Sequence, residues 1–282
     1  MPTNDVRALL RGVLAEESQR RVPRSFDIIG NKQKAVAVVE IPAELRGLEH
    51  VVADAIMRAH GNVKSVLAKE SERTGDFRTR ELRLISGDPD TEVIHRESGF
   101  LLRLDPRKVY FSPRESAERE RISSEVGEHE SVLVMFSGIG PLPICIAKRR
   151  PQAMVTAIEL NPVAHNYCVE NINLNKVADR VTPILGDVRE VCPTLGTIFD
   201  RVIMPLPKGA YLFLDVAVPL TKEGGVLHFY HWAKEPDIFS QAENLIEAAA
   251  KILGRRTEIL EKRRISQYSP RVWKIRVDAR IH

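Results

Sequence analysis

The order of apolar runs after residue 116 is the feature that most limits how this chain can fold. Largely apolar runs alternate there with segments of helical periodicity; the runs are SVLVMF, MVTAIEL, VTPIL, FDRVIM and VLHFYHWA. Such runs are typical of strands buried on both faces, and their alternation with helices predicts a doubly wound parallel sheet. The last two strand candidates, TEILEKRRI and VWKIRVDAR, have no helix between them. We therefore expect them to form an antiparallel hairpin at one edge of the sheet.

The first 112 residues follow a different pattern. An amphipathic helix is expected within residues 1–20, and a second helix from Leu48 to His60. Between and after them, short β-branched segments alternate with glycine turns, as in a small α+β module. We expect two domains, an α+β module over residues 1–112 and a Rossmann-like α/β domain over residues 113–282.

Composition excludes several classes of protein. Hydrophobic residues make up 43% of the chain and charged residues 28%, which is ordinary globular composition. Cys145, Cys168 and Cys192 lie far apart and form no CxxC pair, so neither a zinc framework nor a disulfide scaffold is expected. The start has no apolar signal core, and the longest apolar stretch, 131–147, is interrupted by glycines and prolines. We expect a soluble, cytoplasmic monomer with no membrane span.

A glycine turn follows the first strand of the α/β domain. Phe136 and Ser137 lead into Gly138 and Gly140, and a helix comes next. Glycines at the carboxyl end of a parallel strand let the backbone approach a ligand without a Cβ in the way. A dinucleotide fingerprint would have a third glycine where this chain has Pro143, which argues against a pyrophosphate-binding turn. Taken alone, the turn could also be only a tight corner.

Acidic residues follow the next two strands. Glu159 lies about twenty residues past the glycine turn, where an acid can accept both ribose hydroxyls of an adenosine-containing cofactor. Asp187, followed by Val188, comes after VTPIL, where a carboxylate could accept the adenine amino group. A lone aspartate in that place is more often a helix cap. Together with the terminal hairpin, these successive strand ends are typical of class I S-adenosylmethionine-dependent methyltransferases, so we predict an S-adenosylmethionine pocket.

A proline-rich loop, Met204-Pro205-Leu206-Pro207, follows the strand FDRVI. This strand end faces the methyl donor in such sheets, so the loop should line the substrate pocket. The two prolines each fix φ and stiffen the loop. Without the other motifs, it would be interpreted as a strand terminator.

Further segments recur in a characteristic order: Pro23–Gly30, Phe77–Leu82, Val109–Arg114, Glu118-Arg119, the SGIGP turn, Asp187–Glu190 and Met204–Lys208. Together they resemble the archaeal and eukaryotic tRNA (guanine-37-N1)-methyltransferase family over residues 20–282. Members of that family transfer methyl from S-adenosylmethionine to N1 of guanosine 37 in tRNA, next to the anticodon. The related wybutosine-pathway aminocarboxypropyl transferases share the framework, but their loop after the fourth strand usually contains glycine.

The resemblance implies roles for particular residues. It places a catalytic carboxylate on Glu118 and an essential arginine on Arg78, with Arg80 as the neighbouring alternative. A carboxylate beside N1 of guanine can accept its proton, and a guanidinium can stabilise the charge that develops on O6. Judged without the resemblance, Glu118 lies in a highly charged helix, ESAERERISSE, where an exposed, ion-paired glutamate is the default.

The resemblance also implies the contacts of the two substrates. The tRNA would be contacted by Arg80, Tyr110, Arg114 and Pro207. The cofactor would be contacted by Arg119, Phe136, Ser137, Gly138, Gly140, Glu159, Leu160, Asn161, Asp187, Val188 and Pro205.

Three departures from the family pattern leave alternatives open. Pro205 stands where many members have an asparagine that contacts the target base, and Val134 stands where an acid is frequent. Many members also have a further N-terminal module that inspects the outer corner of the tRNA, and we expect that check to be absent or reduced. One alternative is methylation or aminocarboxypropylation of a wyosine precursor at the same position. The other is a catalytically silent tRNA-binding protein.

The C-terminal tail is strongly basic. Residues 251–282 contain ten Lys+Arg against three Asp+Glu, with Tyr268 and Trp273 between them. We interpret the tail as a surface for the phosphate backbone of a tRNA anticodon stem-loop, with a solvated hairpin face as the alternative. No metal site is expected, because His228 and His231 would point to opposite faces of one strand.

Overall fold

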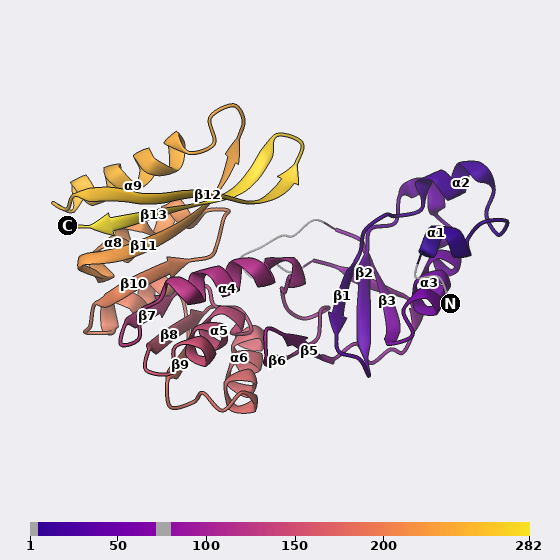
Figure 1. Ribbon diagram of the computed structural model, residues 1–282, viewed down its shortest axis with the longest axis horizontal. Helices are drawn as coiled ribbons and strands as arrows, with labels where there is room; N and C mark the ends of the chain where they lie inside the picture. The colour runs from indigo at the N-terminus through magenta and orange to yellow at the C-terminus, as the bar shows by residue number, and fades with distance from the viewer. Residues whose placement is uncertain (1–4, 72–79) are drawn as a thin grey trace. The chain divides into compact units, whose positions relative to one another are not determined.

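The computed structural model describes residues 5–71 and 80–282 (Figure 1). The chain divides into two compact units, residues 1–116 and 117–282. The elements of the first unit are α1 (Val6–Leu9), α2 (Glu16–Arg21), β1 (Asp27–Gly30), β2 (Ala35–Val39), η1 (Ala43–Leu45), α3 (Glu49–Ala59), β3 (Val63–Lys69), β4 (Leu82–Gly87), β5 (Val93–Glu97), β6 (Phe100–Leu104) and η2 (Pro113–Glu115).

The first unit is built around a sheet of order β1-β2-β3-β4, in which β2 and β3 are parallel and the outer pairs are antiparallel. Every residue of β2 is buried, as its run of alanines and valines predicts. Helix α3 places Val52 and Ile56 in the same core as Ala37 and Val39 of β2. Strands β5 and β6 form a separate antiparallel pair.

The single helix expected within residues 1–20 is wrong. The chain forms the short helices α1 and α2 instead, and Gly12 between them has a φ of +76°. Leu10 and Leu14 both join the core of the first unit, so the chain turns in this stretch to bury them. Positive φ is unfavourable for residues with a Cβ, and Gly12 adopts it without that strain.

The elements of the second unit are α4 (Ser116–Glu125), β7 (Ser131–Val134), α5 (Pro141–Arg149), β8 (Met154–Glu159), α6 (Pro162–Leu174), β9 (Val181–Leu185), α7 (Val188–Val191), η3 (Cys192–Thr194), β10 (Phe199–Met204), η4 (Ala210–Phe213), α8 (Leu214–Leu220), β11 (Thr221–Lys234), α9 (Ser240–Ile252), β12 (Thr257–Ser269) and β13 (Val272–Ile281). None of the helices in the described ranges is both long and apolar enough to cross a membrane.

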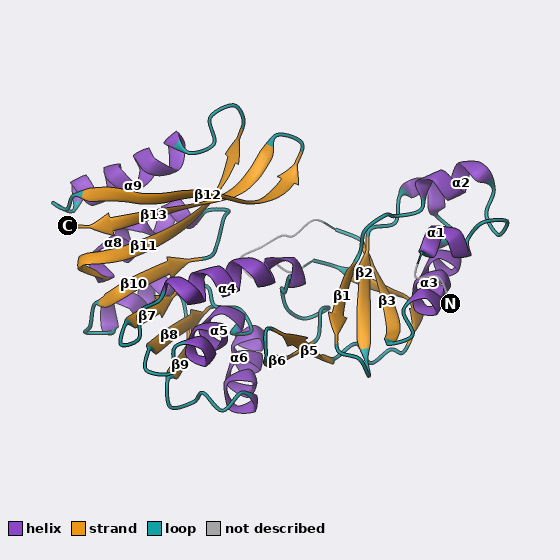
Figure 2. Cartoon of the chain, viewed as in Figure 1, coloured by secondary structure: helices purple, strands orange, loops and turns teal. Residues whose placement is uncertain are grey.

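The second unit is an α/β sheet of order β12-β13-β11-β10-β7-β8-β9, flanked by helices (Figure 2). Strands β7 to β11 pair in parallel, whereas β13 is antiparallel to both of its neighbours, β11 and β12. The expected Rossmann-like sheet with an antiparallel C-terminal hairpin is therefore confirmed. The hairpin returns inward, so that β13 lies inside the sheet and β12 forms its edge.

A substitution at Gly140 can test how tightly the turn after β7 is packed. Its φ is +85°, and an added Cβ would lie 2.7 Å from Sγ of Cys168. We expect Gly140→Ala to lower the free energy of unfolding by about 1–3 kcal/mol through backbone strain, with a further loss from displacing Cys168. Urea denaturation measures the sum of the backbone strain and the loss from displacing Cys168.

Gly224→Ala is the matched control, because Gly224 has a φ of +76° and no atom within 4 Å of an added Cβ. It isolates the backbone strain. An equal loss in the two variants would show that the contact with Cys168 does not require glycine at position 140.

Candidate active site

Parallel pairing brings the carboxyl ends of four strands to one edge of the second unit. Gly138 follows β7, Glu159 ends β8, Asp187 follows β9 and Pro205 follows β10. The remaining residues predicted to contact the cofactor flank these positions, except Arg119, which is buried in α4. The predicted strand-end residues thus meet along this single edge.

Glu159 is bound to the glycine turn. Its Oε2 accepts a hydrogen bond from the backbone N–H of Gly138 at 2.6 Å, and its Oε1 accepts one from the N–H of Asn161 at 2.8 Å. Burial raises the pKa of Glu159, although these backbone donors and that of Leu160 oppose the rise. Each carboxylate oxygen has a second lone pair, so the group can still accept ligand hydroxyls.

The glycine turn leaves room for a ligand beside Glu159. Gly138 has a φ of +58°, and an added Cβ there would meet nothing within 4 Å. Leu160 keeps 37% of its surface exposed although it is apolar. An open backbone, a carboxylate and an exposed apolar side chain together fit the ribose and the flat ring of an adenosine group.

Asn161 and Asp187 have structural roles in the helices that follow them. The side chain of Asn161 accepts from the N–H groups of Val163 and Ala164 at the start of α6. The side chain of Asp187 accepts from the N–H of Arg189 at the start of α7. Both are helix caps. Contact of either residue with a cofactor stays a prediction.

The proline loop after β10 is fixed by its neighbours. The carbonyl oxygen of Pro207, a buried residue, accepts a hydrogen bond from the N–H of Trp232 in β11 at 3.2 Å. Beyond the loop, the ring of Phe213 meets that of Phe136, edge to face, with centroids 5.0 Å apart. Phe136 has a φ of +58°, so it turns sharply out of β7. The turn after β7 is thus in contact with η4, which follows the proline loop.

Glu118 is buried, with 6% of its surface exposed, so the exposed glutamate expected from the charged helix alone is wrong. Its Oε1 accepts hydrogen bonds from the hydroxyl of Tyr230 at 2.7 Å and from Nη1 of Arg276 at 2.9 Å. Its Oε2 accepts one from Nη1 of Arg121 at 2.5 Å. These partners lie in β11, in β13 and one turn further along α4.

The strand register shows where Glu118 lies relative to the carboxyl ends of the parallel strands. Met204, the last residue of β10, is paired with Phe229 of β11. Tyr230 therefore lies level with Pro205, at the carboxyl end of β10. Through its bond to Tyr230, Glu118 is held at the height in the sheet where the proline loop begins.

Arg276 is the centre of a buried ion-pair network. It is fully buried and lies 2.8 Å from Glu125, 3.0 Å from Glu261 and 2.8 Å from Asp278, in addition to Glu118. Burial disfavours its charge, but the surrounding acids outweigh burial and raise its pKa. Burial and Glu118 together raise the pKa of the Tyr230 hydroxyl well above its usual value. One signal in the sequence pointed here: the charged residues of VWKIRVDAR alternate, so they share one face of β13.

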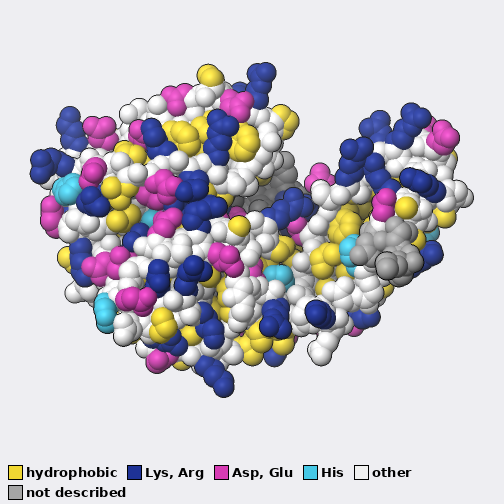
Figure 3. All heavy atoms as spheres, viewed as in Figure 1, with side chains coloured by type: hydrophobic (Ala, Val, Ile, Leu, Met, Phe, Trp, Pro, Cys, Tyr) yellow, Lys and Arg dark blue, Asp and Glu magenta, His cyan; other side chains and the backbone are white. Residues whose placement is uncertain are grey.

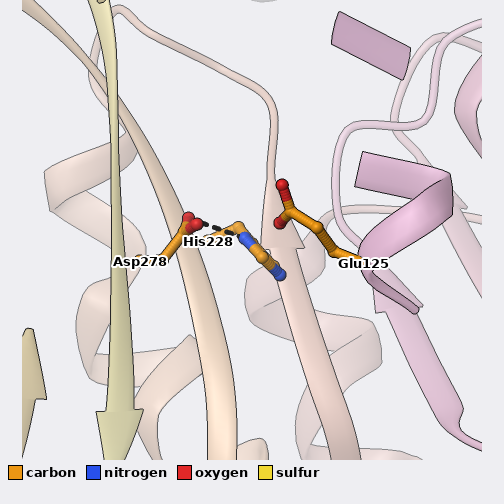
Figure 4. Close-up of side chains that lie close together, drawn as sticks. All are labelled: Glu125, His228 and Asp278. Carbon is orange, nitrogen blue, oxygen red and sulfur yellow. Dashed lines mark hydrogen bonds and ion pairs between the residues drawn. The ribbon is translucent and has the colours of Figure 1, made fainter. Parts of the chain in front are cut away.

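Figure 4 shows Glu125, His228 and Asp278 close enough together to be considered as metal ligands. However, His228 Nδ1 is 2.7 Å from Asp278, and its Nε2 is 2.6 Å from Nη1 of Arg201. Because Arg201 can only donate, Nε2 accepts and Nδ1–H donates to Asp278. Arg276 also lies on both carboxylates. Two guanidinium groups occupy the place of a cation, so these residues do not fit a metal.

In the first unit, Arg80 and Tyr110 line a pocket together with Asp27 and Lys69. Arg114 pairs with Asp27 at 2.5 Å. Burial lowers the pKa of Lys69. Three of the residues predicted to contact tRNA therefore lie in or beside one pocket, whereas the predicted Arg78 lies outside the described residues.

The basic run in β12 is partly neutralised. Lys262 is 3.0 Å from Glu243, Arg263 pairs with Glu261, and the guanidinium of Arg264 lies 5.1 Å from the ring centre of Trp273. Figure 3 shows basic and acidic side chains interspersed over the visible face. Contact of this run with tRNA stays a prediction.

Two family models cover most of the chain. The model described as the TRM5/TYW2 methyltransferase domain matches residues 93–260, and the model described as the TYW2 N-terminal domain matches residues 6–91. The chain belongs to the TRM5/TYW2 methyltransferase family. The predicted family resemblance is confirmed.

Relatives from both branches of the TRM5/TYW2 family are similar to the chain. It is 44% identical to the tRNA (guanine(37)-N(1))-methyltransferase Trm5b of Pyrococcus abyssi, over 94% of this chain and 77% of the relative. It is 40% identical to Trm5b of Methanocaldococcus jannaschii, of which it covers 61%. It is 36% identical to the tRNA(Phe) (4-demethylwyosine(37)-C(7)) aminocarboxypropyltransferase of Methanocaldococcus jannaschii, over 88% of this chain and 96% of the relative.

Solved structures of the TRM5/TYW2 family have the same fold. A complex of aTrm5 with tRNALeu is 33% identical, with a TM-score of 0.86 over 100% of this chain and 80% of that one. Pyrococcus horikoshii TYW2 in complex with MeSAdo is 30% identical, with a TM-score of 0.81 over 98% of this chain and 97% of that one.

Removing Arg276 should be costly, because it would leave its four carboxylates buried or half-buried without their shared partner. We expect Arg276→Met to lower the free energy of unfolding by about 3–5 kcal/mol, measured by urea denaturation. Arg280→Met is the control on the same strand, since Arg280 makes a partly exposed pair with Glu258. It should cost about 0–1 kcal/mol. Similar losses in both variants would contradict a network centred on Arg276.

Proposed function

We propose that this chain transfers a methyl group from S-adenosylmethionine to N1 of guanosine 37 in tRNA, beside the anticodon. The observation that carries the proposal is Glu118, a buried carboxylate held by Tyr230 and Arg276 level with the strand ends that bear Gly138 and Glu159. The 44% identity to a Pyrococcus abyssi protein named as such a methyltransferase supports it.

S-adenosylmethionine supplies an electrophilic methyl group when it is bound. The residues at the strand ends fit it: Glu159 would accept the ribose hydroxyls, and Gly138 would let the backbone come close. Asp187 and Leu160 would contact the adenine. Related structures contain the same kind of ligand, since Methanocaldococcus jannaschii TYW2 is in complex with AdoMet.

Guanine N1 carries a proton at neutral pH, and its lone pair is not available until that proton leaves. In our proposal, Glu118 accepts the proton through its Oε2. The N1–carbon bond then forms as the sulfur–carbon bond of the cofactor breaks, and negative charge that develops on O6 is stabilised by an arginine. Arg78 or Arg80 supplies that guanidinium.

The target base lies inside a stacked loop, so it must be turned out to reach the carboxylate. We propose that Arg80, Tyr110 and Arg114 of the first unit contact the tRNA near the target base. Phosphate contacts from the basic run in β12 would add to this and fix the register. The aTrm5 structure in complex with tRNALeu supports tRNA as the partner.

A wyosine precursor at the same tRNA position is the second candidate substrate. The match to the TYW2 N-terminal domain and the 36% identity to an aminocarboxypropyltransferase favour it. Aminocarboxypropyl transfer would need the cofactor turned so that a different carbon faces the base.

Product analysis separates these reactions. Unmodified tRNA with guanosine 37 is incubated with the protein and S-adenosylmethionine labelled in its methyl carbon, and the nucleosides are examined by mass spectrometry. We expect labelled 1-methylguanosine at position 37. An unlabelled, heavier base or the absence of any new nucleoside would contradict the proposal.

The role of Glu118 is tested by Glu118→Gln, which keeps the shape of the side chain but cannot accept the proton. Single-turnover methylation should slow by roughly 10²–10⁴-fold. Affinity for tRNA and cofactor should stay nearly constant, because the lost interaction acts mainly in the transition state. A variant that methylates at the wild-type rate would remove Glu118 from the mechanism.

The raised pKa of Glu159 predicts that cofactor binding depends on pH. Ionised Glu159 accepts hydroxyl donors, and its pKa is raised by burial, so affinity should fall as the pH is lowered from 7 toward that raised value. Glu159→Gln should bind more weakly at pH 7, by on the order of 1–3 kcal/mol, and its affinity should vary less with pH. Calorimetry with S-adenosylmethionine over a pH series measures both effects. Unchanged binding in the variant would show that the ribose lies elsewhere.

A further inference from the structure

Glu118 presents its two carboxylate oxygens to different surroundings. Oε1 is held from the sheet by Tyr230 and Arg276, which are 2% and 0% exposed. Oε2 is held by Arg121, which lies three residues further along the same helix and keeps 36% of its side chain exposed. One oxygen therefore faces fixed donors, and the other faces a donor that can move.

We propose that Arg121 holds the place of the target base on Glu118 in the free protein and leaves Oε2 when guanine arrives. This inference rests on the proposed function and adds a positioning residue to it. The N–H group of the guanidinium stands where N1–H of guanine would donate.

The exchange of Arg121 for guanine leaves the number of hydrogen bonds to Oε2 unchanged. A buried carboxylate oxygen without a donor is costly, so the free protein needs a partner on Oε2. Guanine presents N1–H as a donor, and this N–H replaces the one that Arg121 withdraws. The carboxylate therefore stays paired before and after the base binds.

Arg121 is the partner suited to leave. Arg276 also binds Glu125, Glu261 and Asp278, so its departure would leave those acids without it. Tyr230 of β11 is 2% exposed, whereas the side chain of Arg121 is 36% exposed. The long stem of Arg121 begins on α4, and its partly exposed head can turn into water.

Departure of Arg121 also has a chemical consequence. Donors on a carboxylate favour its ionised form. Transfer of the N1 proton to Oε2 therefore requires the donor there to have gone. Among the described residues, Glu118 is in direct contact with Arg121 of α4, Tyr230 of β11 and Arg276 of β13. Through Arg276 it is linked to Glu125 of α4, Glu261 of β12 and Asp278 of β13, and Lys274 lies over the ring of Tyr230.

Arg121→Met removes the charge and the donor but keeps an unbranched stem. Two profiles are measured over pH: kcat/KM for tRNA, which reports the free protein, and the single-turnover rate at saturating tRNA, which reports the complex. We expect the acid limb of the kcat/KM profile to move to higher pH by about one unit, a tenfold effect on its low-pH side. The saturated profile should keep its midpoint, since Arg121 has already left in the complex.

Two control variants separate this from a general loss of charge. Arg121→Lys keeps a cation and should restore the wild-type midpoint. Arg149→Met removes an exposed arginine from α5 and should leave both midpoints in place. Equal shifts in both profiles of Arg121→Met would overturn the proposal, because Arg121 would then remain on Glu118 in the complex. No shift in either profile would overturn it as well.

A binding measurement keeps the inference separate from the proposed function. The guanidinium ¹⁵N resonance of Arg121, assigned by its loss in Arg121→Met, should lose its protection from solvent exchange when unmodified tRNA is added. Retained protection would overturn the exchange on Oε2 whatever reaction the protein performs. Failure of the proposed function would instead appear as wild-type protein that forms no 1-methylguanosine.

Discussion

A fully buried guanidinium on β13 is the constraint on which the rest of the second unit depends. Arg276 has to be surrounded by acids, and those acids come from α4, β12 and β13 itself. The C-terminal hairpin supplies this charge because β13 runs antiparallel between β11 and β12. The hairpin is therefore more than an extension of the sheet edge, since it determines where α4 places Glu118.

Buried ion pairs are weak evidence for stability, because apolar residues of similar volume can often replace them. In this chain the network has another consequence: it fixes one oxygen of a carboxylate that we propose as the proton acceptor. Tyr230 and Arg276 hold Oε1 from the sheet, and the other oxygen faces a partly exposed arginine. Rigid support on one side and an exchangeable partner on the other suit a base that must accept its proton only from the substrate.

The parallel sheet, its hairpin and the strand-end motifs could be predicted because each depends on local pattern. Apolar runs, glycines and acids at strand ends need only their neighbours in sequence. The surroundings of Glu118 could not be predicted in this way, since Tyr230 and Arg276 are 112 and 158 residues away. The prediction of a single N-terminal helix was wrong for a related reason. Burial of Leu10 and Leu14 in the core determined the path of the chain, and Gly12 allowed the turn between them.

The most direct test of Glu118 as the proton acceptor is a pH series of the single-turnover rate. The series is measured for the wild-type protein and for Glu118→Gln. The wild-type rate should rise with pH, and this rise should be absent in the variant. A variant whose rate rises over the same pH range as the wild type would show that solvent or another residue takes the N1 proton. Glu118 would then be a structural member of the Arg276 network.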